Sequence, residues 1–217
     1  MPAREIIPTQ SAYLELKAER AGMEEGYRFL DEKRLILAAE ILAMLKDYEE
    51  TRARWEQARR DALTALRGAL GRHGLEELAV YPAAPAPDCG LRIGARSVLG
   101  VRIEDAAAAE QALAPTSPDD AAEGARSGRS FQAAVNPSPE AEQCRAAFAP
   151  LVPLAARLAV LTGNLERLRS EYLRTARRAR ALEDVLLPEI DDTLREIDTA
   201  LEELEREEAV RVRRAAR

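Results

Sequence analysis

Aromatic residues are scarce in this chain of 217 residues, at 4% of the sequence, and there is a single tryptophan. A compact mixed domain fills much of its core with large rings, whereas a thin coiled coil needs few large core residues. Charged residues reach 32%, and alanine, leucine, glutamate and arginine predominate, which is typical of long helices. The composition therefore favours an all-α fold over a mixed globular one.

The residue patterns of a catalytic, cofactor-binding or metal-binding site are also missing. His73 is the only histidine and stands beside glycines at an expected helix end, where surface capping is its ordinary role. Cys89 and Cys144 lack metal-type spacing, and no glycine-rich loop is followed by Lys-Ser or Lys-Thr. We predict no catalytic, cofactor or metal residues, so the chain is not expected to be an enzyme.

Long hydrophobic runs are absent as well. No apolar stretch approaches the ~20 residues of a membrane span, and residues 1–8 lack the apolar region of a secretory signal. Two isolated thiols indicate a reducing compartment, with a disulfide between Cys89 and Cys144 as the alternative. Because the net charge is −6, nucleic acid is not a favoured partner. We expect a soluble cytoplasmic protein without direct membrane insertion.

Two long apolar stripes dominate what is present. In the first, the seam positions alternate in steps of four and three residues, as in a coiled coil. Its members are Leu16, Arg20, Met23, Tyr27, Leu30, Arg34, Leu37, Ile41, Met44, Tyr48, Thr51, Trp55, Ala58, Ala62, Ala65 and Ala69. The second, with a mean spacing of roughly 3.6 residues, comprises Leu161, Leu165, Leu168, Tyr172, Ala176, Ala179, Leu182, Leu186, Ile190, Leu194, Ile197, Leu201 and Leu204.

Each stripe is too narrow to be stable alone in water and must pack against a partner. The nearest partner for each is the other one, so we predict a long antiparallel two-helix coiled coil. Arg20, Arg34 and Thr51 on the first seam argue against a tight, dry interface, because the arginine heads must reach solvent or a third protein. A helical hairpin of this kind transmits force or spans distance.

On composition, the chain divides into three segments: residues 9–74, 75–137 and 138–217. The first helix starts with Thr9 or Ser11 as its cap and ends at a group of glycines. The last segment starts at Ser138, a capping serine that is followed by proline at the first helical position. We expect this last helix to kink near residues 150–153 and at residue 188, where prolines interrupt it.

The middle segment is predicted to form a small head at the closed end of the hairpin. Apolar residues alternate with polar or small ones on both sides of residues 94–97, which we predict as the turn of a β-hairpin. The alternating residues are Leu91, Ile93, Leu99, Val101 and Ile103. A short helix is expected at 105–113, and the remainder up to residue 137 reads as loop.

Charge is spread unevenly along the last segment. An arginine cluster contains no acid and consists of Arg174, Arg177, Arg178 and Arg180, whereas residues 183–208 carry twelve acids. Such blocks indicate contacts with different partners along one shaft, and the alternative is a solvated helix face. A further alternative for the arginines is pairing across the hairpin with acids of the first helix, such as Glu40, Asp47, Glu49 or Glu50.

Both ends of the chain carry a family resemblance. At the N-terminal end it rests on Pro8, Thr9, Leu14, Gly26, Leu30, Lys33, Arg34 and Leu37. At the C-terminal end it rests on Thr175, Arg177, Arg178, Ala181, Leu182, Glu183, Val185, Pro188, Leu201, Glu202, Glu205, Arg206, Glu207 and Arg211. With its proline in the middle of a helix, this pattern resembles the D subunit of V/A-type rotary ATPases, the central-shaft subunit.

The resemblance implies that the hairpin is the rotor axle inside a hexamer of alternating A and B subunits, where ATP is made or hydrolysed. The open end would insert into the hexamer, and the closed end would bind the small F subunit and the funnel-like subunit on the membrane ring. The complex would translocate protons or sodium ions, with this non-catalytic chain peripheral to the membrane. The implied partner contacts are Pro8, Thr9, Lys33, Arg34, Arg174, Arg177, Arg178, Arg180, Glu183, Glu205 and Arg206.

The main alternative is a non-rotary coiled-coil adaptor, or the stalk of a flagellar or type III export ATPase, which is also a helical hairpin. Such stalks are usually shorter and lack a head near mid-chain. A membrane-remodelling coiled coil would need a lysine-bearing amphipathic N-terminal helix, which the sequence lacks. A self-associating filament would need longer uninterrupted heptads than the proline-broken second helix offers.

Overall fold

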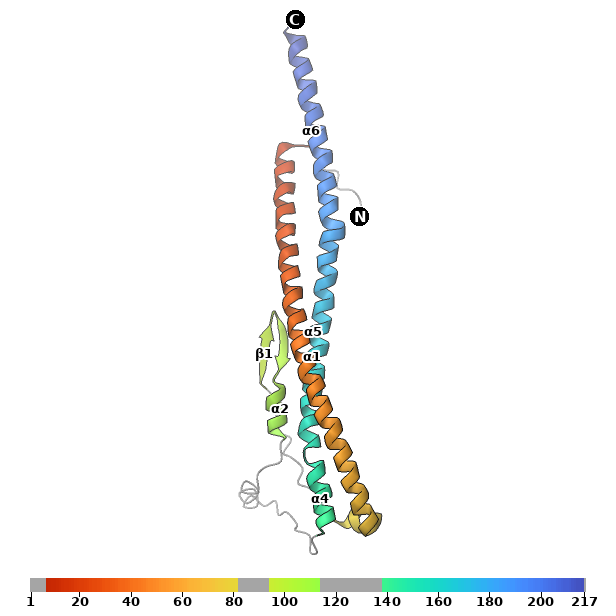
Figure 1. Ribbon diagram of the computed structural model, residues 1–217. Coiled ribbons are helices and arrows are strands. Elements are labelled where there is room, and N and C mark those ends of the chain that lie inside the picture. The colour runs from red at the N-terminus through yellow and green to blue at the C-terminus, as the bar shows by residue number, and fades with distance from the viewer. Residues whose placement is uncertain (1–6, 82–93, 114–137, 217) are drawn as a thin grey trace. The chain divides into compact units, whose positions relative to one another are not determined.

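Long helices account for most of the computed structural model, which describes residues 7–81, 94–113 and 138–216 (Figure 1). The elements in chain order are α1 (Gln10–Val80), β1 (Ala95–Val98), β2 (Val101–Glu104), α2 (Ala106–Ala112), α4 (Pro139–Phe148), α5 (Leu151–Ala181), the π-helical segment η1 (Leu182–Leu186) and α6 (Leu187–Ala215). Internal contacts divide the chain into a terminal unit, Met1–Ala38 with Ser170–Arg217, and a central unit, Ala39–Arg169.

Within each unit, α1 runs antiparallel to the C-terminal helices. Residue numbers rise along α1 while they fall along the helix that it contacts. The ion pairs that show this are Arg20–Asp191 and Lys33–Glu171 in the terminal unit, and Asp47–Arg157 and Arg72–Glu140 in the central unit. The predicted all-α helical hairpin with a small two-stranded insert is therefore confirmed.

The first predicted seam matches the buried side of α1 along its whole length. None of its members is exposed, and Leu37, Ala62 and Ala69 are completely buried. Thr51 is also buried, and its hydroxyl donates to a carboxylate oxygen of Asp47 at 3.4 Å. The alanines in the second half of the seam let two helices pack with few large side chains, which is consistent with the low aromatic content.

The second stripe is buried or half-buried at most of its predicted positions, including Leu161, Leu168 and Ile197. Leu186 and Leu204 are the exceptions, with 38% and 51% of their surface exposed. The two exceptions have different causes: Leu186 lies in η1, and Leu204 lies beyond the part of α6 that faces α1.

The π-helical segment η1 explains the exposure of Leu186. At its end, the N–H of Leu187 bonds to the carbonyl of Leu182, five residues back. Pro188 follows directly and has no N–H to donate to the carbonyl four residues back, so the wider turn accommodates it by inserting one residue into the helix. Leu187 is consequently half-buried while Leu186 turns outward.

The helix starts follow the predicted capping residues. Thr9 Oγ1 accepts the N–H of Ala12 at 3.2 Å, and Ser138 Oγ accepts the N–H of Ala141 at 3.4 Å. The first helix was expected to end at its glycines, and there it passes through one non-helical residue, Gly74 (φ 73°, ψ 173°), before it continues to Val80. Positive φ at this point is a conformation that glycine adopts without strain.

The insert contains the predicted β-hairpin, but its turn was predicted at the wrong place. Residues 95–97, predicted as turn, belong to β1, and Val98 pairs with Val101 across the hairpin. The turn consists of Leu99 and Gly100, with φ of 48° and 87°, as a type I′ turn requires. Leucine gives no sequence signal for positive φ, which explains the error.

The described part of the insert lies along the side of the helix pair within the central unit. Arg96 of β1 contacts Glu40 of α1, and the backbone of Glu104 bonds to Asn164 of α5. This part of the head is thus not at the closed end of the pair. α2 matches the short helix predicted at 105–113. Some predicted features fall outside the described residues: Cys89, the strand residues Leu91 and Ile93, and the loop at 114–137.

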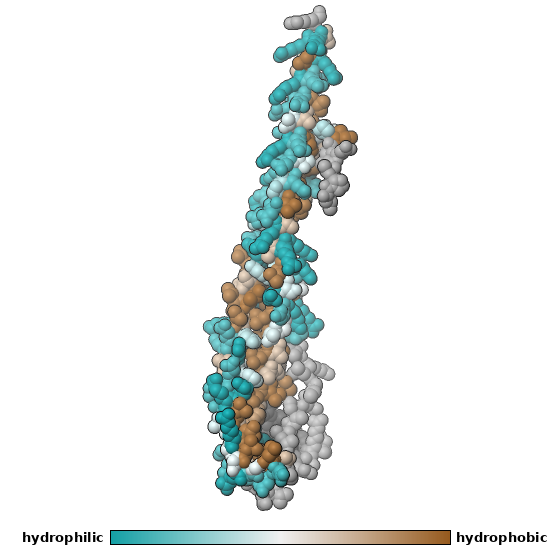
Figure 2. Space-filling view, turned by 90° about the vertical axis from the view of Figure 1, so that its right-hand side faces the viewer, coloured by the Kyte–Doolittle hydropathy of each residue, from teal (hydrophilic) through white to brown (hydrophobic). Residues whose placement is uncertain are grey.

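One stretch within Pro139–Ala215 is long and apolar enough to cross a membrane, judged by length and composition alone. Its mean hydropathy is 1.6 and 22% of it is buried, so the expectation that no such stretch exists was wrong. The same helices supply Leu154, Val160 and Leu161 to the core of the central unit, which accounts for part of this apolar character. Figure 2 shows that hydrophobic side chains also remain on the surface of this unit.

Candidate functional site

The last part of α6 is the most exposed helical segment in the described chain. Residues 202–216 are all exposed, because α6 continues past the first turn of α1 within the terminal unit (Figure 1). Leu204, Val210 and Val212 expose 51%, 47% and 64% of their surface. A single helix of this length is marginally stable in water, so its apolar residues favour a partner outside this chain.

Two of the predicted partner-contact residues, Glu205 and Arg206, lie on this exposed segment. Arg206 pairs with Glu202 at 3.0 Å, and Arg211 pairs with Glu207 at 3.5 Å, both one helical turn apart. Such pairs stabilise an exposed helix by roughly 0.2–0.5 kcal/mol each. Figure 2 shows a mostly hydrophilic surface here with separate hydrophobic side chains.

The predicted arginine cluster is exposed on the terminal unit. Arg174 approaches Glu171 at 3.6 Å, whereas Arg177, Arg178 and Arg180 have no ion pair within 4 Å among the residues that the structure describes. Two acids considered as cross-hairpin partners are engaged elsewhere: Glu40 with Arg96 and Asp47 with Arg157. Arg177, Arg178 and Arg180 are therefore exposed and have no close ion pair within the described residues.

Lys33 and Arg34, also predicted to contact a partner, form ion pairs within the terminal unit. Lys33 Nζ lies 2.6 Å from Glu171 Oε1, and both side chains are mostly buried. This hydrogen bond lowers the pKa of Glu171 below its ordinary value. Arg34 lies 2.5 Å from Asp31, one turn earlier on α1. Lys33 thus joins α1 to α5, whereas Arg34 pairs within α1.

The remaining predicted contacts, Pro8, Thr9 and Glu183, lie in the terminal unit too. Thr9 caps α1, and Pro8 precedes it. A hydrogen bond from Tyr27 to Glu183 raises the pKa of the tyrosine. The structure thus brings every predicted contact residue into the terminal unit, some in internal pairs and others facing outward.

Sequence reasoning missed Asp191 as the partner of Arg20. Arg20 Nε lies 2.5 Å from Asp191 Oδ1, and this contact lowers the pKa of the aspartate. The arginine on the seam therefore pairs across the helices while its side chain stays 40% exposed. The signal was present, because Asp191 follows Ile190 on the second stripe and an antiparallel pair places it opposite the N-terminal part of α1.

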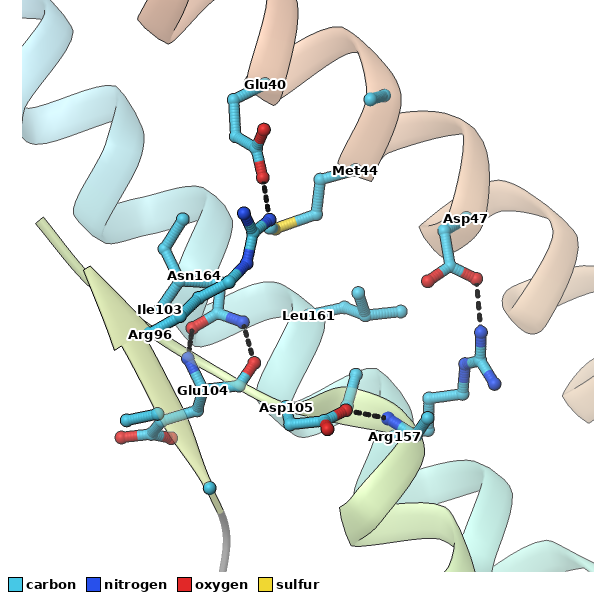
Figure 3. A pocket seen from close by; sticks show the side chains of 15 residues that line it. Glu40, Met44, Asp47, Arg96, Ile103, Glu104, Asp105, Arg157, Leu161 and Asn164 are labelled. Carbon is cyan, nitrogen blue, oxygen red and sulfur yellow. Dashed lines mark hydrogen bonds and ion pairs between the residues drawn. The ribbon is translucent and has the colours of Figure 1, made fainter. Parts of the chain in front are cut away.

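A groove in the central unit, lined by both polar and apolar side chains, was also missed. It has a volume of about 620 Å³ between the insert and the helix pair, and its lining includes Met44, Arg96, Arg157, Leu161 and Asn164 (Figure 3). Within the described ranges, no group of three or more His, Cys, Asp or Glu side chains could hold a metal ion. Polar contacts beside this groove, made by Arg96, Arg157 and Asn164, attach the insert to the helix pair.

Comparison with known proteins decides the family. The family model described as the D subunit of ATP synthase matches residues 12–217. The chain belongs to this family. It is 33% identical to the V-type ATP synthase D subunit of Anaeromyxobacter dehalogenans over 206 residues, covering 95% of this chain and 93% of the relative. It is 28% identical to the A-type ATP synthase D subunit of Pyrococcus horikoshii over 212 residues, covering 96% and 92%.

A relative from Thermotoga neapolitana, a V-type ATP synthase D subunit, is 24% identical over 209 residues and 96% of both chains. Members of this family are non-catalytic subunits of rotary ATPases, which serve ATP synthesis and ion transport. The chain is accordingly one component of a multi-subunit complex. The exposed helix end and the exposed arginines lie on the surface of this component.

Proposed function

We propose that this chain is the central rotor shaft of a proton- or sodium-translocating V/A-type ATPase or ATP synthase. It transmits torque between the catalytic hexamer of A and B subunits and the membrane ring. The observation that carries the proposal is the exposed end of α6, residues 202–216, in a chain that belongs to the D-subunit family. A helix that extends beyond the helix it packs against needs a surrounding protein to cover its apolar side chains.

The terminal unit, which holds both chain ends, is the part proposed to enter the hexamer. It exposes the arginine cluster on α5 and acidic residues along α6, so opposite charges follow one another along the helices. Guanidinium groups form forked hydrogen bonds with carboxylates. We assign these arginines to carboxylate- or carbonyl-bearing loops of the A and B subunits.

The central unit is the part proposed to bind the remaining rotor subunits. The small F subunit and the funnel-like subunit on the membrane ring are the partners that the family implies. The apolar side chains left exposed on this unit, including Leu42, Leu63 and Val152, suit lasting contacts that turn together with the shaft. A rotor needs such permanent contacts at one end and weaker, exchanging contacts in the hexamer.

Two structural properties support torque transmission. Ion pairs join the helices laterally within each unit, as Lys33 does with Glu171 and Arg157 with Asp47, so the pair resists shear. The shaft is also asymmetric. The helices α1 and α6 carry different side chains, and within the terminal unit α6 extends past the first turn of α1. An asymmetric axle presents a different face to each of the hexamer's sites, which is how rotation can order their states in time.

Reconstitution of the complex with and without this chain tests the proposal. In ion-tight vesicles, the complete complex should couple ATP turnover to ion transport, whereas the complex lacking this chain should turn over ATP with no transport. A truncation after residue 201 provides an intermediate variant with the exposed helix end removed. Full coupling in the absence of the chain would disprove the rotor role.

The export-stalk alternative differs in what a cross-link does. A disulfide between an introduced cysteine at Glu207, which is exposed on α6, and the surrounding hexamer stops a rotor and leaves a static adaptor active. Reversible arrest of ATP turnover, relieved by a reductant, is the result expected for the shaft. Unchanged turnover at complete cross-linking would favour the adaptor.

A further inference from the structure

The β-hairpin and α2 form a small module, residues 94–113, whose own core is thin. β1 is exposed along most of its length, and only Val101 and Ile103 of β2 with Ala106 and Ala109 of α2 are buried. A two-stranded hairpin alone is marginally stable in water. The module therefore depends on the helix pair for its structure.

Asn164 of α5 binds the end of β2 through both the oxygen and the nitrogen of its side-chain amide. Its Oδ1 accepts the backbone N–H of Glu104 at 2.9 Å, and its Nδ2 donates to the backbone carbonyl of Glu104 at 2.7 Å. Only 1% of Asn164 is exposed. The amide thus pairs with Glu104 as a residue of a third strand would (Figure 3).

Arg167, one turn later on α5, fixes the orientation of that amide. It donates to Asn164 Oδ1 at 3.0 Å and to the Glu104 carboxylate at 3.0 Å. The donor from Arg167 fixes the oxygen on the side of the Glu104 N–H, so the amide cannot flip without losing all three bonds. An aspartate here would place a carboxylate against the Glu104 carbonyl, where an N–H donor now sits.

Charged contacts hold the rest of the module. Arg157 bridges three elements, with Nη1 at 2.7 Å from Glu110 of α2 and Nη2 at 2.6 Å from Asp47 of α1. Arg54 of α1 reaches Glu110 at 3.4 Å. Arg96 of β1 contacts Glu40 of α1. The groove of about 620 Å³ left beside these contacts shows that apolar packing does not fill the interface.

We infer that Asn164 and Arg157 are positioning residues of a releasable latch, which docks the hairpin–α2 module onto the helix pair through charge and amide contacts. Because most of these contacts are ionic and partly exposed, the docked state weakens as ionic strength rises. Release frees the module without unfolding the helix pair, because the seam shares only a few residues, such as Met44 and Leu161, with the groove beside the module. Docking is a property of the chain alone, so its failure or success leaves the proposed rotor function untouched.

Hydrogen exchange of the full chain, read by mass spectrometry, tests the latch. In Asn164→Asp, exchange within residues 95–112 should accelerate at least about tenfold, while peptides of α1 and α5 change by less than about twofold. Arg157→Gln should act in the same direction. Arg169→Gln is the matched control, since Arg169 is exposed on α5 and pairs only with Glu166 among the described residues. Unchanged module exchange, or equal acceleration in the long helices, would overturn the inference.

A charge swap separates pairing from folding defects. Arg96→Glu alone should accelerate module exchange, and Arg96→Glu together with Glu40→Arg should restore it, because the reversed pair can form again. In the unmodified chain, raising the salt from about 0.05 M to about 0.5 M should accelerate module exchange selectively. A double variant as loose as the single one, or exchange that is insensitive to salt, would show that the contacts do not act as an ionic latch.

Discussion

At the scale of single residues, the terminal unit is held together by charges as much as by apolar packing. Its fully buried side chains are few among the described residues, namely Leu37, Thr175, Ala179 and Ile197. Ion pairs between the helices supply the rest, and the Lys33–Glu171 pair is the most sheltered, with side-chain exposures of 16% and 20%. A partly buried pair contributes more than an exposed one because water screens it less.

Glu171→Gln tests this pair through pH. Since Lys33 lowers the pKa of Glu171 from its ordinary value of 4.5, the carboxylate adds stability above about pH 4.5, and this stability is lost as the pH falls through the lowered pKa. We expect the substitution to reduce the free energy of unfolding by about 1 kcal/mol at pH 7, and to have little effect near pH 3. Urea unfolding at both pH values measures it, with Glu203→Gln on exposed α6 as control. An equal loss at both pH values would contradict the assignment.

At the scale of elements, two departures from regular geometry shape the fold. η1 lets the helix pass Pro188 by adding one residue, and the hairpin turn places Leu99 at positive φ. A non-glycine residue in that region costs roughly 1–2 kcal/mol. The turn is therefore a point at which the sequence is not optimal for its own structure.

Leu99→Asn should stabilise the hairpin. Asparagine tolerates positive φ, and Asn-Gly is a preferred pair for a type I′ turn. We expect about 0.5–1 kcal/mol of added stability, seen as slower hydrogen exchange in residues 95–104. Ser97→Asn is the control, because it adds the same side chain to an exposed position of β1. Gly100→Ala should act in the opposite direction, since Gly100 has φ of 87°. Faster exchange in Leu99→Asn would mean that leucine makes contacts that outweigh its strain.

At the scale of the whole molecule, the sequence predicts what depends on periodicity and misses what depends on distant contacts. The seam from Leu16 onward follows from apolar positions that alternate in steps of four and three residues. The start of the helix after Ser138 follows from the capping preference of serine. Asn164 gave no signal, because its partner Glu104 lies 60 residues away and a lone asparagine within a helix suggests nothing. The extra residue in η1 was equally hidden, since a proline in a helix predicts an irregularity but not its geometry.

The arginine cluster is the charged surface through which we propose that the shaft contacts the hexamer. Arg177→Gln with Arg178→Gln removes two exposed charges that have no ion pair within 4 Å in the described residues, so the melting temperature of the isolated chain should change by less than about 2 °C. Binding to the A/B hexamer, or coupled ATP turnover, should weaken clearly, and the difference from the unmodified chain should be largest at low salt, where charge contacts are least screened. Arg195→Gln serves as the control, because Arg195 already pairs with Asp192 at 2.9 Å within α6. If the double variant instead melts several degrees lower alone and binds the hexamer normally, the cluster is an internal staple, and the contacts between shaft and hexamer must be carried by the exposed end of α6.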